Sequence, residues 1–582
     1  SSANAAGGAV QILVGDGGPK VPLDGIPGLH YHYDPLKQTI DLQLSDSIRN
    51  PNVLGRRRPT TVSSSADSGL LINYDAYVQA PANQLSATSL GLYAEQRLFS
   101  PLGILDNTGV QNVRRSSGDY VRLDSAWHYD LVDRLSTALV GDAISSSLAW
   151  TRSVRLGGFQ FRRNFNLRPD LITFPVPQLG GSAAVPSAVD LYVNNVRQLS
   201  TQVPSGPFVI DNVPAINGSG LATLVVRDAL GRSVSTSLPV YVDSRMLSRG
   251  LDSFAFEGGL LRLNYGVRSF DYGGAPAFNG VYRYGLNDAL TLEGHAEGSS
   301  GLLNSGGGGL VRLGQFGVVN ASLSGSVGPT RNGVQAGLGY QLVLSSMSFT
   351  AQSSRAYRSY GDLAAIGGSP PPRVFDQATL SIPLFRTQTL GLSYIHLNGN
   401  GVGPSQLASV SYSVQLPHSL SLIFNAYQDF DQHATRGLWL GLSFYLGNQT
   451  SGFASGGINN GHSNYGASVS KSAPYNGGWE WAAQASRSGA SDNLLARGGY
   501  LGRFGEAWVA EQHAAGLDNL SLEAGGSLVL MDHSIELSRR IYDSFALVST
   551  DGVAGVPVLH ENRLLGRTDS GGHLLVPDLN GY

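Results

Sequence analysis

The chain has 582 residues, a net charge of −3 and a charged-residue content of 14%, against about 25% in a typical soluble protein. A hydrophobic content of 42% excludes a disordered chain, and the near-neutral charge excludes a broad electrostatic platform for nucleic acid. The absence of cysteine excludes a disulfide scaffold, a thiolate metal site and a cysteine nucleophile.

No segment supplies the ~20 apolar residues of a membrane helix. No basic and apolar signal peptide opens the chain at Ser1. Either it has been removed or the sequence begins partway through the gene product, and we expect the second. Glycine is abundant, at 75 residues, against a usual share of about 7%. Both barrels and tight turns use glycine in this way.

The first zone, residues 1–67, is rich in proline and ends near a basic run, Arg56–Arg58. Short strands are expected at Leu29–Tyr33 and Thr39–Leu44. We interpret this zone as the latter part of a small soluble domain followed by a linker. His30 and His32 would share one strand face without a third ligand, so we predict no metal site.

The second zone, residues 68–175, alternates apolar and polar residues with period two, which is the strand period. In Leu70–Gln79, for example, Ile72 and Val78 point one way, and Asn73 and Asp75 point the other. An apolar face toward lipid and a polar face toward a water-filled lumen are typical of a transmembrane β-barrel. About six barrel strands are expected here.

The third zone, residues 176–242, reads like a compact β-sandwich. Ala188–Val193 and Leu221–Arg227 are apolar strand runs, and Asn194-Asn195 is a hairpin turn signal. A small folded domain within a barrel sequence is a natural plug, because large barrels are usually plugged. We predict that it blocks the pore at rest.

Alternation returns in residues 243–550. In Leu290–Glu297, Leu290 and Leu292 point to one face of the expected strand. Glu293, His295 and Glu297 point to the other face. At roughly 17 residues per strand, including turns, this zone holds about 18 strands, and the barrel about 24 in all. Aromatic residues near strand ends are expected in girdles at the membrane interfaces, although cross-strand packing would also explain them. They are Trp127, Trp150, Phe316, Tyr340, Trp439, Trp479 and Trp508.

Lumen-facing charges are the candidates for holding the plug through exposed ion pairs, each contributing about 0–1 kcal/mol. The alternative is that they simply solvate the lumen. The candidates are Arg122, Asp124, Glu293, His295 and Glu297. Residues 551–582 read as the start of a short soluble β-domain that stops at Tyr582.

Several motifs of this sequence resemble those of the outer-membrane ushers of the chaperone–usher pilus pathway. Val203–Val213 is similar to the plug motif PPGPFxIxDL, and Gly220–Arg232 resembles the strand pair that follows it. Leu139–Asp142 resembles LxxGD, and Thr568–Pro577 resembles a segment of the first C-terminal domain. The motif positions are Pro204, Gly206, Pro207, Phe208, Ile210, Asp211 and Gly220.

The chain also departs from the family pattern. Met246–Gly250 lacks the proline of the usual LLRPG segment, only part of the N-terminal domain is present, and the late cysteine pair is missing. The form resembles a short or divergent usher, such as the spore-coat-U type.

The resemblance implies an all-β fold: a large barrel of about 24 strands, an inserted β-sandwich plug, and partial periplasmic β-domains at both ends. It implies a gated secretion channel in the outer membrane of a Gram-negative bacterium. The expected partners are periplasmic chaperone–subunit complexes, pilin subunits and outer-membrane lipid, and the resemblance allows a homodimer. Energy would come from donor-strand exchange between subunits.

Two other classes stay open. A plugged outer-membrane transporter or porin for small solutes would carry its plug at the N-terminus, whereas here the sandwich follows about six strands. A structural or adhesive surface β-protein would need no lumen charges. No GxSxG, HExxH or P-loop motif is present, so we predict neither an enzyme nor a cofactor, metal or nucleic-acid site.

Overall fold

The computed structural model of the chain is almost entirely β-structure. It describes residues 13–15, 18–20, 23, 28–35, 39–44, 52–54, 67–82, 88–114, 117–176, 179–183, 185, 187–194, 196–204, 206–210, 217–228, 233–399, 402–474, 476–560 and 562–579. Helical structure in these residues is limited to short turns: η4 (Val132–Arg134), η5 (Phe165–Leu167) and α1 (Ala364–Gly367). No helix among them is long and apolar enough to cross a membrane.

The first block of the barrel has six antiparallel strands. They are β6 (Gly69–Pro81), β7 (Ser89–Ser100), β8 (Gly103–Arg114), β9 (Ser117–Leu131), β10 (Ser136–Ile144) and β11 (Arg155–Arg163). Each strand pairs with the next along the chain, so the block is a simple meander. The alternating pattern of residues 68–175 therefore forms the strands that it predicts.

The second block has eighteen strands. They are β18 (Asp252–Arg262), β19 (Tyr272–Asn287), β20 (Leu290–Ser299), β21 (Leu302–Arg312), β22 (Val318–Val327), β23 (Gly333–Val343), β24 (Ser348–Arg358), β25 (Val374–Leu384), β26 (Gln388–Gly399), β27 (Val402–Leu416), β28 (Leu420–Asp429), β29 (Arg436–Gly447), β30 (Thr450–Asn459), β31 (His462–Lys471), β32 (Gly478–Ser488), β33 (Ser491–Leu501), β34 (Glu506–Ala514) and β35 (Leu517–Met531).

The two blocks join into one closed barrel of 24 strands, which confirms the predicted fold class. β11 pairs directly with β18 across the inserted segment, and β35 closes the ring on β6 from Asn519 opposite Pro81 to Met531 opposite Gly69. The short strand β36 (Ser534–Ser538) folds back onto the end of β35 and adds to that edge. Closure leaves no free sheet edge in the wall.

The insert, which we define as strands β12 to β17, is a small two-sheet body between β11 and β18. Its strands are β12 (Leu179–Ala183), β13 (Ser187–Val193), β14 (Val196–Val203), β15 (Gly206–Ile210), β16 (Gly218–Asp228) and β17 (Ser233–Val242). Its core includes Val189, Leu191, Phe208 and Leu224, which are all buried. The insert therefore has its own packed core.

The ends of the chain form smaller sheets. The N-terminal strands are β1 (Leu13–Gly15), β2 (Gly18–Lys20), β3 (Leu29–Asp34), β4 (Thr39–Leu44) and β5 (Asn52–Leu54). The C-terminal strands beyond β36 are β37 (Ser544–Ser549), β38 (Pro557–His560), β39 (Arg563–Arg567) and β40 (His573–Leu579). β5 does not pair with its sequence neighbours. It pairs in parallel with β15 of the insert.

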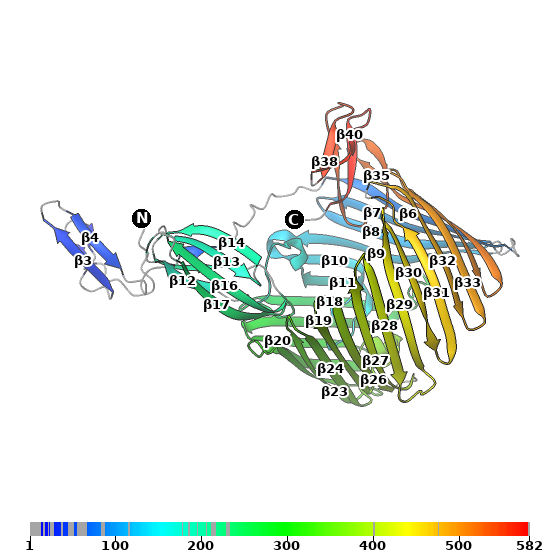
Figure 1. Ribbon diagram of the computed structural model, residues 1–582, viewed down its shortest axis with the longest axis horizontal. Helices are drawn as coiled ribbons and strands as arrows, with labels where there is room; N and C mark the ends of the chain where they lie inside the picture. The colour runs from blue at the N-terminus through cyan, green and yellow to red at the C-terminus, as the bar shows by residue number, and fades with distance from the viewer. Residues whose placement is uncertain are drawn as a thin grey trace.

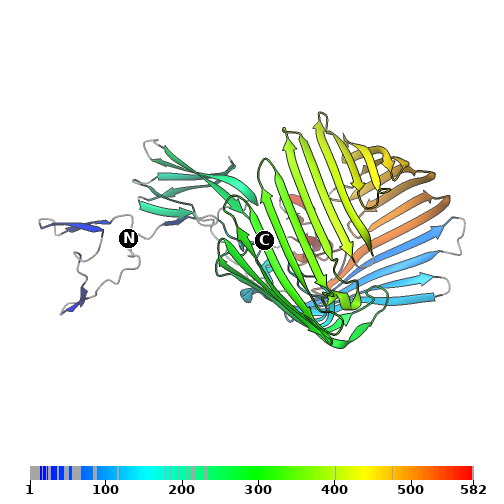
Figure 2. The same cartoon turned by 90° about the horizontal axis from the view of Figure 1, so that it is seen from below.

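The barrel has two different ends. The N-terminal strands, the insert and the C-terminal strands all attach at one end, which we call the terminal end. The opposite end, which we call the loop end, carries the long connections 145–154, 263–271 and 359–373. Figure 1 shows the insert beside the barrel and the C-terminal strands above β35 and β6, and Figure 2 shows the insert outside the barrel from a second direction.

Candidate functional site: the barrel lumen

Three of the predicted charges lie on the lumen face of β20. Glu297 is 1% exposed and His295 is 7% exposed, whereas Leu292 on the other face is 44% exposed. Glu297 pairs with Asn279 of β19 and with Asn304 of β21, and directly paired residues share one face of a sheet. This row of buried polar side chains, with Glu293 two residues away, lines the inside of the barrel.

The connection between β10 and β11, residues 145–154, lies against this row from inside the lumen. Trp150 Nε1 donates to Glu293 Oε2 at 3.0 Å, and its ring stands edge-on to His295 with 5.8 Å between the ring centroids. The backbone N–H of Ser146 donates to Glu257 Oε1 at 2.8 Å. The carboxylates therefore hold this loop against the wall.

A second loop, residues 359–373 with α1, enters the lumen beside the first. The backbone N–H of Leu363 donates to Glu297 Oε1 at 2.9 Å. Leu363 is fully buried against the lumen-side leucines Leu156, Leu261 and Leu302. Asn304 Nδ2 donates to the Tyr360 hydroxyl at 3.0 Å, and burial raises the pKa of Tyr360. Apolar packing and buried hydrogen bonds together dock the loop on the wall.

An ion pair joins the two loops. Arg152 Nε donates to Asp362 Oδ2 at 2.7 Å, and a second guanidinium nitrogen reaches Oδ1. Burial disfavours the charge of Arg152, but the hydrogen bonds and the charge of Asp362 outweigh that effect, and the pKa of Arg152 is raised. A bidentate geometry of this kind fixes orientation as well as supplying energy.

Arg122 and Asp124 lie on the other side of the wall, which differs from the predicted lumen-facing position. Arg122 shares a face with Tyr120, which pairs with Gln111 and through it with the exposed Leu92. The register of β8 with β9 shifts between Asn107 and Gly109. This bulge adds one residue to β9, and one extra residue reverses the alternation beyond it.

The connection 263–271 covers these two charges. Arg122 binds Asp142 and donates to the Ser269 carbonyl at 3.1 Å, while Asp124 accepts from Arg155 at 3.0 Å and from the Tyr265 hydroxyl at 2.8 Å. Burial, and then the charge and hydrogen bond of Asp124, raise the pKa of Tyr265. The cluster ties a loop to the outside of the wall.

The recorded partners of all five predicted charges, within the described residues, belong to the barrel and its loops. Besides the contacts given above, Glu293 accepts from Arg283 Nε at 2.9 Å, and Arg122 donates to the Tyr272 hydroxyl at 2.6 Å. His295 lies 3.6 Å from Glu297. The role of these charges in holding the insert stays a prediction.

Two residues of the plug-like motif, Phe208 and Ile210, lie in the core of the insert. Phe208 and Ile210 are each 1% exposed and pack with Val189 and Leu191. Pro204 is exposed and Pro207 is half-buried, and Gly220 lies in β16 opposite Val240. Gly206 begins β15, opposite Ala183. Asp211 lies outside the described residues. Two of the motif positions thus stabilise the sandwich itself.

The insert lies outside the lumen in this structure, whereas the sequence predicts that it blocks the pore (Figures 1 and 2). It approaches the wall at the terminal end of β23, where the Tyr241 hydroxyl donates to the Gln341 carbonyl at 3.4 Å and Gly218 lies next to Val343. On its far side, β15 is extended by β5.

Opposite the loops, the lumen face of β28 to β31 is almost uncharged. The register aligns Asn425, Trp439, Gly457 and Asn464 on this face. In these fully described strands the inner face carries one carboxylate, Asp429, at the loop end. We call this surface the neutral wall, and the lumen face of β18 to β20 the charged wall.

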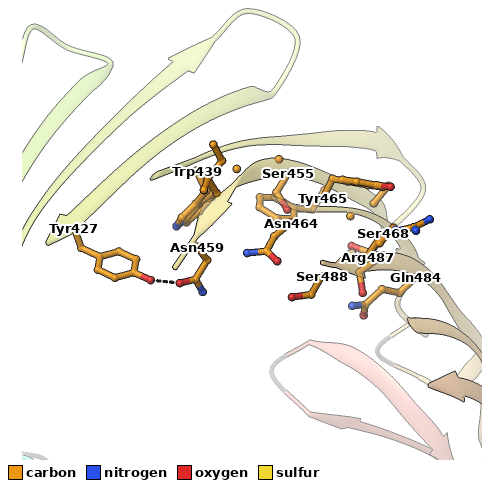
Figure 3. A pocket seen from close by; sticks show the side chains of 17 residues that line it. Tyr427, Trp439, Ser455, Asn459, Asn464, Tyr465, Ser468, Gln484, Arg487 and Ser488 are labelled. Atoms are coloured by element: carbon orange, nitrogen blue, oxygen red, sulfur yellow. Dashed lines mark hydrogen bonds between the residues drawn. The ribbon is translucent and has the colours of Figure 1, made fainter. Parts of the chain in front are cut away.

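A pocket of about 680 Å³ lies in the neutral wall and continues onto β32. Figure 3 shows the Tyr427 hydroxyl bonded to Asn459, with Asn464, Ser488 and Gln484 on the same side. Trp439 lies over Gly457, where an added Cβ would meet Trp439 Cβ at 2.6 Å. The polar groups that line this pocket are mainly amides and hydroxyls, together with Arg487.

The aromatic girdle forms only in part. Trp127 and Trp479 lie on the outer face, and Trp479 is 70% exposed. Trp150, Trp439 and Trp508 point to the lumen side, where Trp150 binds Glu293 and Trp508 binds Glu480. A tryptophan near a strand end can point either to the outer face or to the lumen. Its position in the sequence therefore does not assign it to a membrane interface.

These features define a closed membrane barrel whose lumen is occupied by loops from one end and whose inserted domain lies at the other. The sequence profile described as outer membrane usher protein matches residues 377–582. Two relatives are PefC of Salmonella typhimurium (strain LT2), 28% identical over 268 residues, and HifC of Haemophilus influenzae, 24% identical over 434 residues. The matches cover 44% and 66% of this chain, and 32% and 48% of the relatives.

A third relative, FaeD of Escherichia coli, is 26% identical over 277 residues, which are 47% of this chain and 32% of FaeD. The chain thus aligns with about a third of PefC and FaeD. Among solved structures, the cryo-EM structure of the E. coli P pilus tip assembly intermediate PapC-PapD-PapK-PapG in the second conformation is similar, with a TM-score of 0.69, 16% identity, and coverage of 97% of this chain and 73% of that chain. This likeness establishes the fold.

Residues 377–582 thus carry the outer membrane usher profile, and the relatives described above are outer membrane ushers. The chain is a protein of the Gram-negative outer membrane. Long loops of bacterial barrels are extracellular and short turns periplasmic, which predicts that the loop end faces outward and the terminal end faces the periplasm.

Proposed function

We propose that this chain is the translocation pore of a pilus usher. It passes folded pilin subunits, delivered by periplasmic chaperones, through the outer membrane and orders their assembly on the surface. The observation that carries the proposal is the closed 24-strand barrel with a folded insert between its sixth and seventh strands. Barrels of 16 to 18 strands already leave an aqueous channel, so this one is wide enough to need a plug.

The domain assignments follow from the same proposal. Residues 176–242 are the plug, residues 1–67 and 551–582 are parts of periplasmic domains, and residues 68–175 and 243–550 are the two barrel blocks. The position of the insert at the periplasmic end is then the open position of the plug. In that position β5 pairs with β15, and this strand addition satisfies backbone groups at the edge of the insert.

The transport step needs no chemistry from this chain. The lumen offers carboxylates already bound to loops and a neutral wall of amides and hydroxyls. Among the described residues no three His, Asp or Glu side chains group as a metal site. We infer that the chain is not an enzyme, and that donor-strand exchange between subunits supplies the free energy of assembly.

A transporter or porin for small solutes is the second candidate. A narrow solute pore would keep its constriction during transport, whereas here the constriction is built from two docked loops and a detached domain. The partners named in the solved PapC-PapD-PapK-PapG assembly also favour protein cargo over solutes.

The direct test is capture of a chaperone–subunit complex encoded beside this gene. The purified chain is expected to bind the complex, and a cysteine introduced into the neutral wall at Ser455 should cross-link to the subunit, because the native chain has no cysteine to interfere. A cysteine at Leu440, on the lipid face of the same strand pair, is the matched control. Absence of complex binding, or equal cross-linking at both positions, would overturn the proposal.

A further inference from the structure

Three arginines converge on one pocket at the loop end of the barrel. Arg331 lies in the turn between β22 and β23, Arg358 ends β24, and Arg373 comes directly before β25. All three line a pocket of about 340 Å³, together with the hydroxyl-bearing Thr330 and Ser359. This volume is at the low end of the range for small-molecule sites.

The positive charge of this pocket has no acidic counterpart. Its lining contains no carboxylate, and none of the three arginines has a recorded ion pair among the described residues. The nearest carboxylates along the chain, Asp362 and Asp376, are already paired with Arg152 and Arg355. Three clustered cations repel one another unless an anion joins them.

The three arginines also surround the docked loop. Arg358 and Arg373 stand at the two ends of loop 359–373, and both are exposed. Arg331 donates from its guanidinium to the Ala365 carbonyl at 2.6 Å, inside α1. An anion bound to all three would therefore tie both ends of the loop to the neighbouring turn.

We propose that this pocket binds a phosphate group. A phosphate monoester offers several anionic oxygens, and guanidinium groups bind such oxygens in pairs. The pocket faces the outer surface of the outer membrane, where the source is either free phosphate or the phosphorylated head group of a glycolipid. Binding would hold loop 359–373, and with it the Arg152–Asp362 ion pair, in the docked position. The proposal does not depend on what the barrel transports.

The test is equilibrium binding to the detergent-solubilised chain, with inorganic phosphate and with a lipid A glycolipid as two separate probes. The double variant Arg358→Gln/Arg373→Gln removes two exposed cations and leaves the structural Arg331 in place. We expect it to weaken phosphate-group binding at least tenfold. The variant Arg358→Lys/Arg373→Lys keeps the charge and should keep part of the affinity.

The matched control is Arg436→Gln, an exposed arginine at the loop end of β29, outside the pocket. It should bind like the wild type, and circular dichroism with a heating scan verifies that each variant is a folded barrel. Tighter binding of the glycolipid than of inorganic phosphate identifies the head group as the source, and the reverse identifies free phosphate. Failure of the wild type to bind either probe, or equal binding by the double glutamine variant, would overturn the proposal.

Discussion

The charged wall and the neutral wall line the same lumen, and the charged wall is the one that binds the two loops that enter the lumen. Glu257, Glu293 and Glu297 each accept a hydrogen bond from a loop that enters the lumen. The neutral wall offers hydroxyl and amide side chains with glycines between them, and a pocket lies in it. Buried carboxylates need fixed partners, whereas hydroxyls and amides at a wet surface exchange partners with water at little cost. The charged wall therefore docks the two loops, and under the proposed function the neutral wall is the side along which a subunit passes.

The largest expected effect comes from removing the apolar anchor of the docked loop. Leu363→Ala leaves a cavity among Leu156, Leu261 and Leu302, and such truncations cost about 2–5 kcal/mol. Backbone amide hydrogen exchange of residues 359–373 should become faster, because the loop is held less tightly against the wall. The control Ile423→Ala, on the neutral wall, should change exchange at this loop very little. Equal exchange in Leu363→Ala and the wild type would show that the loop is not held by packing.

Breaking the ion pair between the loops should have a smaller effect. A double-mutant cycle of Arg152→Ala and Asp362→Ala is expected to give a coupling energy of about 1–2 kcal/mol, because the Arg152 side chain is 37% exposed and solvent screens the pair. Tryptic cleavage after Arg358 and Arg373 reports loop release. Additive effects of the two substitutions would contradict the direct contact.

Glu257→Gln tests how much a carboxylate of the charged wall contributes to stability, because glutamine has nearly the same shape as glutamate but no charge. Glu257 accepts from the Ser146 N–H at 2.8 Å, Gln160 at 3.0 Å and Asn279 at 2.6 Å. A glutamine turns one acceptor oxygen into a donor that faces other donors, which costs about 1–3 kcal/mol. The measurement is the thermal unfolding midpoint, and an unchanged midpoint would mean that these contacts contribute nothing to stability.

The smallest effect on stability is expected when a carboxylate is added to the neutral wall rather than removed from the charged wall. Asn425→Asp adds a carboxylate to a surface that faces the lumen, and unfolding should change by no more than about 0.5 kcal/mol. Cation selectivity in planar bilayers should nevertheless rise, because the new charge lies on the ion path. A large loss of stability here would remove the distinction between the two walls.

Much of the fold could be predicted from the sequence because strand alternation is a local property. Leu290–Glu297 separates its faces as the residues indicate, and two blocks of about six and eighteen strands form the barrel. The identities of the lumen loops could not be predicted in this way. Asp362 and Leu363 lie in a segment without periodicity, and their partners Arg152 and Glu297 are 210 and 66 residues away.

The position of two charges escaped prediction for a different reason. Alternation assigns Arg122 and Asp124 to the lumen only if the strand is regular, and the bulge in β9 is set by pairing with β8 rather than by its own sequence. The insert also has a strand partner that is distant in the chain, since β5 lies about 150 residues before β15. Long-range pairing of this kind leaves no local signal.

The most direct test of the proposed pore is single-channel conductance in planar bilayers, comparing the chain with one that lacks residues 176–242. We expect the intact chain to alternate between a low and a higher conductance level as the insert enters and leaves the lumen. The deleted chain should lose the low level. Identical records from the two proteins would contradict the assignment of the insert as a plug.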